Sequence, residues 1–419
     1  HMFLIDDSTC TLVNGCHHLV KNFGCQITHL YVYGIMIFLF SSCQDPSISE
    51  PAEQTSQQTP PPRSGNYVGH QKCAECHADI AEKHLSSPHA HTFALTKDSN
   101  VAAMLCGMSV KASPPFNGYE YACDDQGLTA AIPEKFQEVF PLDFALGSGK
   151  HAVTFLTLMQ DASGDPVGIE HRKTWFSSDK SLGLTPGHDD QVPNADGEYF
   201  GRIFIGDDLT RCIDCHTTAA NIVGRELVNL YPNVQCEECH GPGSEHVAAA
   251  ELDEANLHFK IESRWSAKAE IQMCGRCHRL PEDVDPDRLK RYPKSLVRFQ
   301  SIGLLQSPCF LKSEGKLSCT TCHSPHDAVE SRTHEEQIQT CLTCHQADVP
   351  EHVVCPVSPQ QDCVRCHMPA IDLVRGIQFH DHWIRVRDEE FKVTSKAEQT
   401  GHEKVMETET ILQSGSSDE

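Results

Sequence analysis

Seven copies of the pattern Cys-x-x-Cys-His carry the residues of this chain that are best spaced for chemistry. The two cysteines of such a motif can add to the two vinyl groups of one porphyrin, and the histidine that follows can ligate the iron as its proximal ligand. Each motif therefore predicts one covalently attached haem c, seven in all. The predicted haem-attaching thiols are Cys73, Cys76, Cys212, Cys215, Cys236, Cys239, Cys274, Cys277, Cys319, Cys322, Cys341, Cys344, Cys363 and Cys366. The predicted proximal ligands are His77, His216, His240, His278, His323, His345 and His367.

Zinc is the alternative cofactor for any single motif, because CxxC pairs also bind that metal. A structural zinc site needs four ligands, so such pairs normally work two at a time or with a distant Cys or His pair. Here the number of motifs is odd, and a histidine follows the second cysteine of every one. The set as a whole favours haem.

Each haem iron also needs a sixth ligand, or keeps that position open. His246 follows one motif in the sequence CHGPGSEH and His326 follows another in CHSPH, while His89 and His91 follow the first motif. His151 lies in a glycine-rich approach, GSGKH, just before an expected strand. These five are our candidate distal ligands, and each can serve a neighbouring haem instead of its own. The alternative for each is a solvated or hydrogen-bonded histidine.

The intervals between the last six motifs set the elements that must position the haems. Only 24 residues separate Cys212 from Cys236, which leaves room for one short helix or loop per haem. We therefore predict a mainly α fold with extensive loops, organised around a core of closely spaced haems.

The long interval between the first and second motifs has a different pattern. Residues 119–123 and 128–132, and residues 152–158 and 167–176, alternate like paired strands with turn-rich segments between them. They predict a small β-containing insertion. Cys106 and Cys123, and likewise Cys309 and Cys355, lie outside the motifs and can form disulfides or remain as unpaired buried thiols.

The N-terminal region has the composition of an export device. An apolar run at 30–40 is too short to span a bilayer and is typical of a signal peptide. The residues at 40–43, FSSC, resemble a bacterial lipobox, which predicts a lipid anchor on Cys43; an ordinary cleaved signal is the alternative. We expect a leader at 1–43, a flexible tether at 44–66, a first haem segment at 67–103, the β-containing insertion at 104–211, a six-haem domain at 212–394 and a disordered tail at 395–419.

Composition limits the compartment and the partners. A count of 22 cysteines in 419 residues is unusual for a reducing cytosol, and c-type attachment implies the periplasm or the cell exterior. The formal net charge of -24 argues against nucleic acid as a partner. It suits a basic docking partner, although a well-solvated surface has the same composition.

A family resemblance rests on short motif contexts between residues 67 and 373. Tyr67-Val68-Gly69 before CAECH, the stretch HLSSPHAHTF from His84, and CIDCH followed by CEECHGPGSEH resemble multihaem c-type cytochromes of the cytochrome c-554 and hydroxylamine oxidoreductase-like group. That resemblance implies closely packed haems that pass electrons between redox partners. It also includes catalysts with one open haem iron, but the nitrite reductases among them end their catalytic motif in lysine, whereas all seven motifs here end in histidine.

These observations predict an exported, lipid-anchored cytochrome with seven haems. We expect it to relay electrons between redox partner proteins, other cytochromes among them. The alternative is an oxidoreductase that acts on a small nitrogen or sulfur compound at one five-coordinate haem. A third hypothesis is a membrane-attached scaffold that docks other proteins. An open, ligand-binding haem would favour the enzyme, and uniformly six-coordinate haems would favour the relay.

Overall fold

Antiparallel strands build the region between the first and second motifs. The protein is described here from a computed structural model, which describes residues 66–387 except 113–116, 189–191, 256, 258–265, 347–353 and 359. The predicted leader with Cys43, the tether up to residue 65 and the predicted tail at 395–419 lie outside the described residues.

The largest sheet is organised around β7, a nine-residue strand whose apolar side chains fill both of its faces. Phe155, Leu156 and Leu158 are completely buried, as expected for a strand that is covered on both sides. Phe155 packs in one hydrophobic cluster and Leu156 and Leu158 in another. The sheet runs in the order β1 (Phe93–Leu95), β6 (Phe144–Leu146), β7 (Ala152–Gln160), β8 (Pro166–His171) and β11 (Gly201–Ile205), while β9 (Lys173–Phe176) pairs with both β7 and β10 (Ser181–Leu184).

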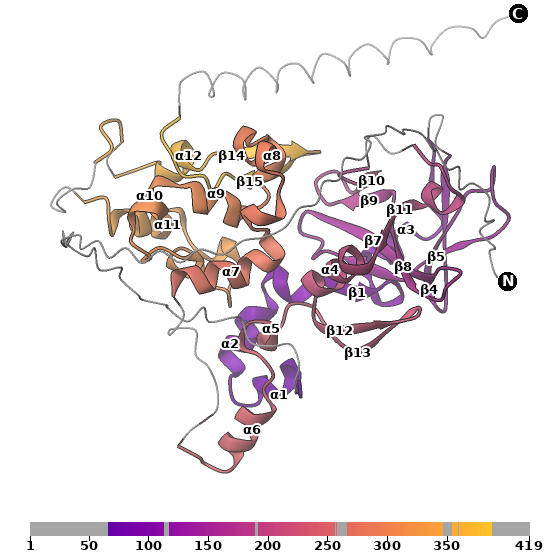
Figure 1. Cartoon of the computed structure of the whole chain (residues 1–419), viewed down its shortest axis with the longest axis horizontal. Helices are drawn as coiled ribbons and strands as arrows, with labels where there is room; N and C mark the ends of the chain where they lie inside the picture. The colour runs from indigo at the N-terminus through magenta and orange to yellow at the C-terminus, as the bar shows by residue number, and fades with distance from the viewer. Residues whose placement is uncertain are drawn as a thin grey trace, which may run out of the picture. The chain divides into compact units, whose positions relative to one another are not determined.

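Helix α4 (Gly206–His216) covers one side of this sheet and carries the second motif at its end (Figure 1). Its residues Leu209 and Ile213 are buried in the same cluster as Leu156 and Leu158 of β7. The apolar stripe of α4 therefore fixes the second motif against the β sheet.

Three smaller antiparallel sheets complete the described strands. One contains β2 (Ser109–Val110), β3 (Tyr119–Asp124), β4 (Gly127–Ala131) and β5 (Phe140–Leu142); the others are the hairpins β12 (Thr217–Val223) with β13 (Glu226–Pro232) and β14 (Ala370–Val374) with β15 (Ile377–His380). A disulfide joins Cys106, at the end of α3, to Cys123 of β3. Cys309 and Cys355 are not disulfide-bonded.

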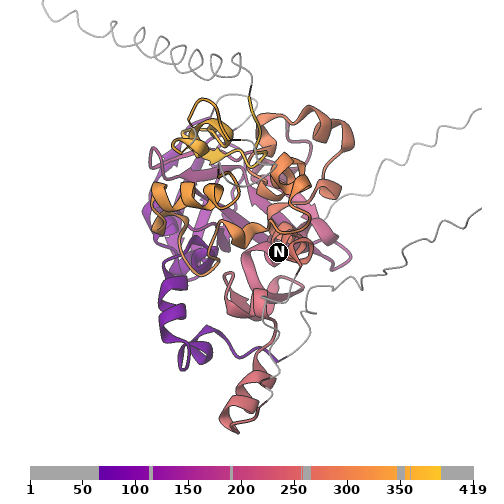
Figure 2. The ribbon, with the colours of Figure 1, turned by 90° about the vertical axis from the view of Figure 1, so that its left-hand side faces the viewer.

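The helices are short, and in the later part of the chain loops link them one after another (Figure 2). No helix among the described residues is long and apolar enough to cross a bilayer. The α-helices are α1 (His70–Ala74), α2 (Ala78–Leu85), α3 (Asn100–Leu105), α4, α5 (Cys236–His240), α6 (Ser244–Glu251), α7 (Ala267–His278), α8 (Pro286–Arg291), α9 (Gln300–Gln306), α10 (Pro308–Lys312), α11 (His334–Leu342) and α12 (Cys363–His367). The 3-10 helices are η1 (Pro88–His91), η2 (Thr96–Asp98), η3 (Asp196–Tyr199), η5 (Pro281–Asp283), η6 (Lys294–Leu296), η7 (Cys319–Thr321) and η8 (Val329–Ser331).

The prediction of a mainly α fold is wrong. The strands are not confined to a small insertion at 104–211: β1 already lies at residues 93–95, β12 and β13 separate the second and third motifs, and β14 and β15 follow the seventh. The predicted strands within 119–158 are present, and the one predicted at 167–176 divides into β8 and β9 on either side of the buried Arg172. Two causes explain the error. β1 and β15 have only three and four residues, too few to show a period of two, whereas the seven-residue strands β12 and β13 lie in the interval between motifs for which we expected one short helix or loop.

Candidate haem centres

A helical turn places the functional atoms of each motif on one side of the backbone. Residues three and four apart are neighbours on a helix, so the two cysteines and the histidine of CxxCH point the same way. The second, third, fourth and seventh motifs end or form α4, α5, α7 and α12. Where the helix is shorter the turn still closes, because the backbone N–H of His77, His323 and His345 donates to the carbonyl of the first motif cysteine at 2.9, 2.9 and 3.0 Å.

Second contacts fix several of the motif histidines by their Nδ1 atoms. Nδ1 of His216 lies 2.9 Å from the carbonyl oxygen of Thr92, and Nδ1 of His278 lies 2.9 Å from Oε1 of Gln300. Nδ1 of His367 lies 3.1 Å from the carbonyl oxygen of Arg385. A histidine held this way presents Nε2 to a metal. Burial also lowers the pKa of His216, His278 and His323, which favours the neutral imidazole that ligates iron.

Four motif histidines each face a second histidine from a distant part of the chain. The rings form pairs with centroid distances between 6.1 and 6.3 Å and interplanar angles between 15° and 69°. The pairs are His77 with His246, His240 with His326, His278 with His89, and His323 with His382.

This spacing fits two ligands of one iron. A metal–imidazole bond is about 2 Å long and the ring centre lies about 1 Å beyond the nitrogen, so axial imidazoles on opposite sides of an iron have centroids about 6 Å apart. Aromatic rings in ordinary contact also have centroids about 4.5–7 Å apart, so the distance alone does not decide. What distinguishes these four pairs is that each joins a motif histidine to a second histidine. The interplanar angle is free, because each ring can turn about its bond to the metal. The residues present therefore fit a haem iron between each pair.

The candidate distal ligands separate into two groups. His246, His326 and His89 face motif histidines, as described above. His91 is exposed and its Nε2 lies 2.7 Å from the carbonyl oxygen of Leu85, and His151 packs beside Phe379 with 5.4 Å between ring centroids. Neither of these two faces a motif histidine in the part of the chain that the structure describes.

His382 is not among the five distal ligands predicted from the sequence. It lies just after the short strand β15 rather than close behind a motif, and the two histidines of the alternating stretch FHDHWIRVR are the local signal that could have found it. Burial lowers the pKa of His382 to about 4, and burial with the nearby His278 lowers that of His89 to about 4. Both imidazoles are thus neutral at pH 7.

His70 and His84 form a further pair at 6.3 Å in which neither ring belongs to a motif. Nδ1 of His70 lies 3.8 Å from Sγ of Cys236, the first cysteine of the third motif. These two histidines therefore border the third haem centre.

The motifs contact one another in a defined order. Sγ of Cys274 in the fourth motif and Sγ of Cys319 in the fifth lie within 4.8 Å of each other. A hydrogen bond from the Cys73 thiol to Cys236 is the largest cause that raises the pKa of Cys73, which places the first motif beside the third. A hydrogen bond with Cys215 has the same effect on Cys277, which places the second motif beside the fourth.

Two further contacts extend this order. Arg276 in the fourth motif donates to Oε1 of Glu238 in the third at 3.0 Å. Burial, followed by the nearby thiols of Cys363 and Cys322, raises the pKa of Cys341 to about 11, so the sixth motif lies near both the seventh and the fifth. The contacts describe a line through motifs one, three, four, five, six and seven, with motif two as a branch at motif four.

Zinc coordination fits this arrangement poorly. Within the described residues, Glu270, Cys274 and Cys319 are a group of three potential metal ligands, whereas structural zinc takes four. The Glu270 carboxylate accepts hydrogen bonds from the backbone N–H of Thr320 at 2.7 Å and from its hydroxyl at 2.8 Å. Its role in the protein is therefore to hold the start of the fifth motif against α7.

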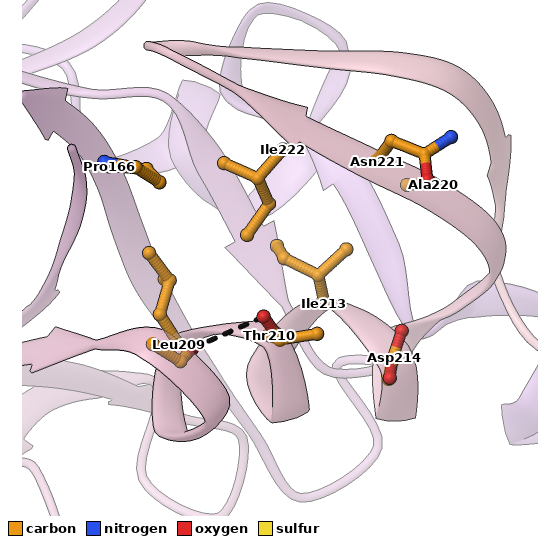
Figure 3. A pocket seen from close by; sticks show the side chains of 9 residues that line it. Pro166, Leu209, Thr210, Ile213, Asp214, Ala220, Asn221 and Ile222 are labelled. Carbon is orange, nitrogen blue, oxygen red and sulfur yellow. Dashed lines mark hydrogen bonds between the residues drawn. The ribbon is translucent and has the colours of Figure 1, made fainter. Parts of the chain in front are cut away.

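A separate cavity of about 280 Å³ lies between α4 and β12 (Figure 3). Leu209, Ile213 and Asp214 from the helix and Ile222 from the strand line it. Leu209 lies three residues before Cys212 and Ile213 three residues before His216, so both are neighbours of the second motif on α4. Cys212 also packs against the cluster that contains Leu209 and Ile213, and the cavity therefore borders the second motif.

Comparison with known families supports the same cofactor. A family model described as a doubled CXXCH motif matches residues 313–350, which include the fifth and sixth motifs. A second, described as cytochrome c554 and c-prime, matches residues 202–241, which include the second and third motifs. These matches support covalently bound haem c and, in general terms, electron transfer.

Comparison with whole proteins adds little. No curated protein matches the chain. A solved structure, that of the outer cell wall cytochrome OcwA, is similar with 14% sequence identity and a TM-score of 0.44, over 76% of this chain and 79% of that one. A TM-score of this size does not establish a shared fold.

Proposed function

We propose that this chain, which is a multihaem c-type cytochrome, binds seven haems and relays electrons between redox partner proteins outside the cytoplasm. The seven CxxCH motifs supply the attachment sites, and the facing histidines His246, His326, His89 and His382 supply distal ligands to the haems of motifs one, three, four and five. When bound, each haem supplies a one-electron redox centre. The protein holds these centres close together and tunes their potentials by ligation and burial.

The contact between the fourth and fifth motifs is the single observation that carries this proposal. Their thiols, Cys274 and Cys319, lie within 4.8 Å of each other although 45 residues separate them in sequence. Porphyrins attached to these two thiols have to lie next to each other. Electron transfer between neighbouring centres needs this closeness, and a protein that only stored haem would not.

An extracytoplasmic location follows from two features of the chain. Covalent haem c attachment implies the periplasm or the cell exterior, and the disulfide between Cys106 and Cys123 is typical of an oxidising compartment. A lipid anchor on Cys43, followed by the tether, would hold the relay at a membrane surface, where other cytochromes are suitable partners. The net charge of -24 favours partners with a basic docking face.

Haem counting and redox titration of the purified full-length holoprotein test the proposal. We expect seven covalently bound haems per chain by intact mass and pyridine haemochromogen absorbance, and a reductive titration that spans a wide range of potentials. After mixing with a substoichiometric reductant, electrons should redistribute among the haems faster than they exchange between molecules. Fewer haems, or haems that equilibrate only through collisions between molecules, would contradict the relay.

A further inference from the structure

A buried carboxylate lies at the contact between the fourth and fifth motifs. Glu270 lies on α7 four residues before Cys274, so the two side chains are neighbours on one face of the helix. Glu270 is 8% exposed. One of its carboxylate oxygens and the Sγ atoms of Cys274 and Cys319 all lie within 4.8 Å of one another. These sulfurs are the predicted attachment points of two different haems, so the carboxylate borders both.

Hydrogen bonds alone hold the charge of Glu270. Its two oxygens accept from the backbone N–H of Thr320 at 2.7 Å and from the Thr320 hydroxyl at 2.8 Å. Within the residues that the structure describes, Glu270 forms no ion pair with a cation. A buried charge without a counter-charge costs free energy, and a neutral amide could accept hydrogen bonds from Thr320 at lower cost. The contact with Thr320 therefore does not explain why this position carries a charge.

The neighbouring contact, between the third and fourth motifs, has a balanced charge. Glu238 is 7% exposed and its Oε1 lies 3.0 Å from Nη2 of Arg276. The fields of a carboxylate and of a guanidinium at this distance largely cancel at the haems on either side. The two contacts thus differ in net charge, although each holds one motif against the next.

A fixed negative charge near a haem favours its oxidised state. Ferric haem carries one more positive charge than ferrous haem, so a nearby carboxylate stabilises the ferric form and lowers the reduction potential. Because Glu270 lies beside the sulfurs of two motifs, its charge acts on two haems. A lower potential at the fourth motif keeps electrons from resting where the contacts between motifs branch.

We propose that Glu270 sets reduction potentials in the relay, because its buried and unbalanced charge lowers the potentials of the haems of motifs four and five together. This inference rests on the proposed haem content and electron relay. The alternative is a structural role, in which Glu270 only holds Thr320 against α7. That role needs the hydrogen bonds and not the charge, so an experiment can separate the two.

Spectroelectrochemical titration of the full-length holoprotein and of Glu270→Gln tests the proposal. Glutamine keeps an oxygen that accepts a hydrogen bond from Thr320 and removes the charge. At a fixed applied potential the ratio of ferrous to ferric haem should rise about tenfold at two haems, a shift of about 59 mV for each one-electron centre. Glu270→Asp retains the charge and should keep both potentials low, even where the temperature of thermal unfolding falls.

Glu282→Gln is the matched control. This carboxylate also follows the fourth motif closely, but it is exposed to water, which screens its charge, so the substitution should shift no potential. Thr320→Lys is a second variant that leaves Glu270 in place. Thr320 is exposed, and a lysine there would supply the missing counter-charge and should raise the same two potentials as Glu270→Gln.

Three results would overturn the proposal. The first is a set of potentials in Glu270→Gln and Thr320→Lys equal to those of the parent, and the second is a rise at fewer than two haems. The third is a shift in Glu270→Asp as large as that in Glu270→Gln, which would leave the structural role. Haem counting on each sample and the redistribution of electrons in the parent separate these results from a failure of the relay itself.

Discussion

His89 tests at the scale of one residue whether the facing histidines are iron ligands. Its ring lies 6.2 Å from that of His278, whereas His91, two residues later, is exposed and contacts a backbone carbonyl. His89→Ala should remove one axial ligand and convert one low-spin ferric haem to high spin, because alanine offers no donor atom. Electron paramagnetic resonance of the oxidised protein measures this change.

The control for that substitution is His91→Ala, which should leave the spectrum of the parent protein unchanged. Equal spectra for the two variants, whether both changed or both unchanged, would mean that the pairing with His278 does not reflect ligation. Haem content measured on the same samples distinguishes a lost ligand from a lost haem.

The buried His171 should make the free energy of unfolding depend on pH, through a group that does not ligate iron. Its buried ring accepts a hydrogen bond from the Tyr121 hydroxyl at 2.8 Å and donates to the carbonyl oxygen of Phe200 at 2.9 Å, and burial lowers its pKa to about 3. Between this value and the unfolded value near 6.5 only the unfolded state binds the proton, so the free energy of unfolding decreases as pH falls below 6.5. The contribution is roughly 1 kcal/mol for each pH unit.

Urea unfolding at pH 7, 6 and 5, followed by far-ultraviolet circular dichroism, measures the effect. His171→Gln should be less stable than the parent at pH 7 and should lose less stability on acidification, because glutamine does not titrate. A parallel pH profile in both proteins would show that other groups determine the acid sensitivity.

The proximal half of each haem centre follows from five consecutive residues, and for this reason the sequence predicts it. The distal half depends on tertiary structure. His246 and His326 follow motifs closely, but His382 reaches His323 from 59 residues away and carries no motif of its own. Counting could not select it, since the chain has 26 histidines.

At the scale of elements, the contact between α4 and β8 determines where the second motif lies. Gly168 makes this contact possible, because the position has no room for a side chain beneath Leu209. Gly168→Ala should push the helix away from the strand and lower the free energy of unfolding by about 1–3 kcal/mol, the usual cost of overpacking.

Gly197→Ala provides the comparison, since a methyl there would meet Ile169 at an ordinary 3.5 Å. Thermal unfolding of both variants measures the difference. If Gly168→Ala is as stable as Gly197→Ala, the close contact between β8 and α4 does not position the helix.

The strands show which elements a sequence can reveal. β7 is predicted because nine residues rich in β-branched and apolar side chains leave little choice. β1 and β10 are not, because three or four residues carry no detectable period and these strands exist only by pairing with β6 and β9. The mainly α prediction failed for the same reason: the motif spacing describes the haem-rich segments but contains no information about pairing between distant short strands.

At the scale of the whole molecule, motif four is the junction of the contacts between motifs. It contacts motif two through Cys215 and Cys277, motif three through Arg276 and Glu238, and motif five through Cys274 and Cys319. In the proposed relay, any electron that passes between the second motif and the rest of the line would therefore cross the haem of motif four. The first motif, in contrast, has the third as its neighbour and lies at an end.

His89→Met changes the potential of the junction haem and so predicts a loss of conduction. Replacing a distal histidine with methionine raises the potential of a haem, so an electron should rest on this centre instead of moving on. Escape from such a trap slows about tenfold for every 59 mV. His246→Met makes the same chemical change at the first motif, an end of the line, and should raise one potential without slowing transit elsewhere.

Spectroelectrochemical titration measures the potentials, and the catalytic current of an adsorbed film between a soluble donor and an electrode measures transit. Equal currents in the two variants, with equal shifts in potential, would contradict a relay whose path runs through motif four, because a trap on that path slows transit and a trap at an end that the electrons do not use has no such effect.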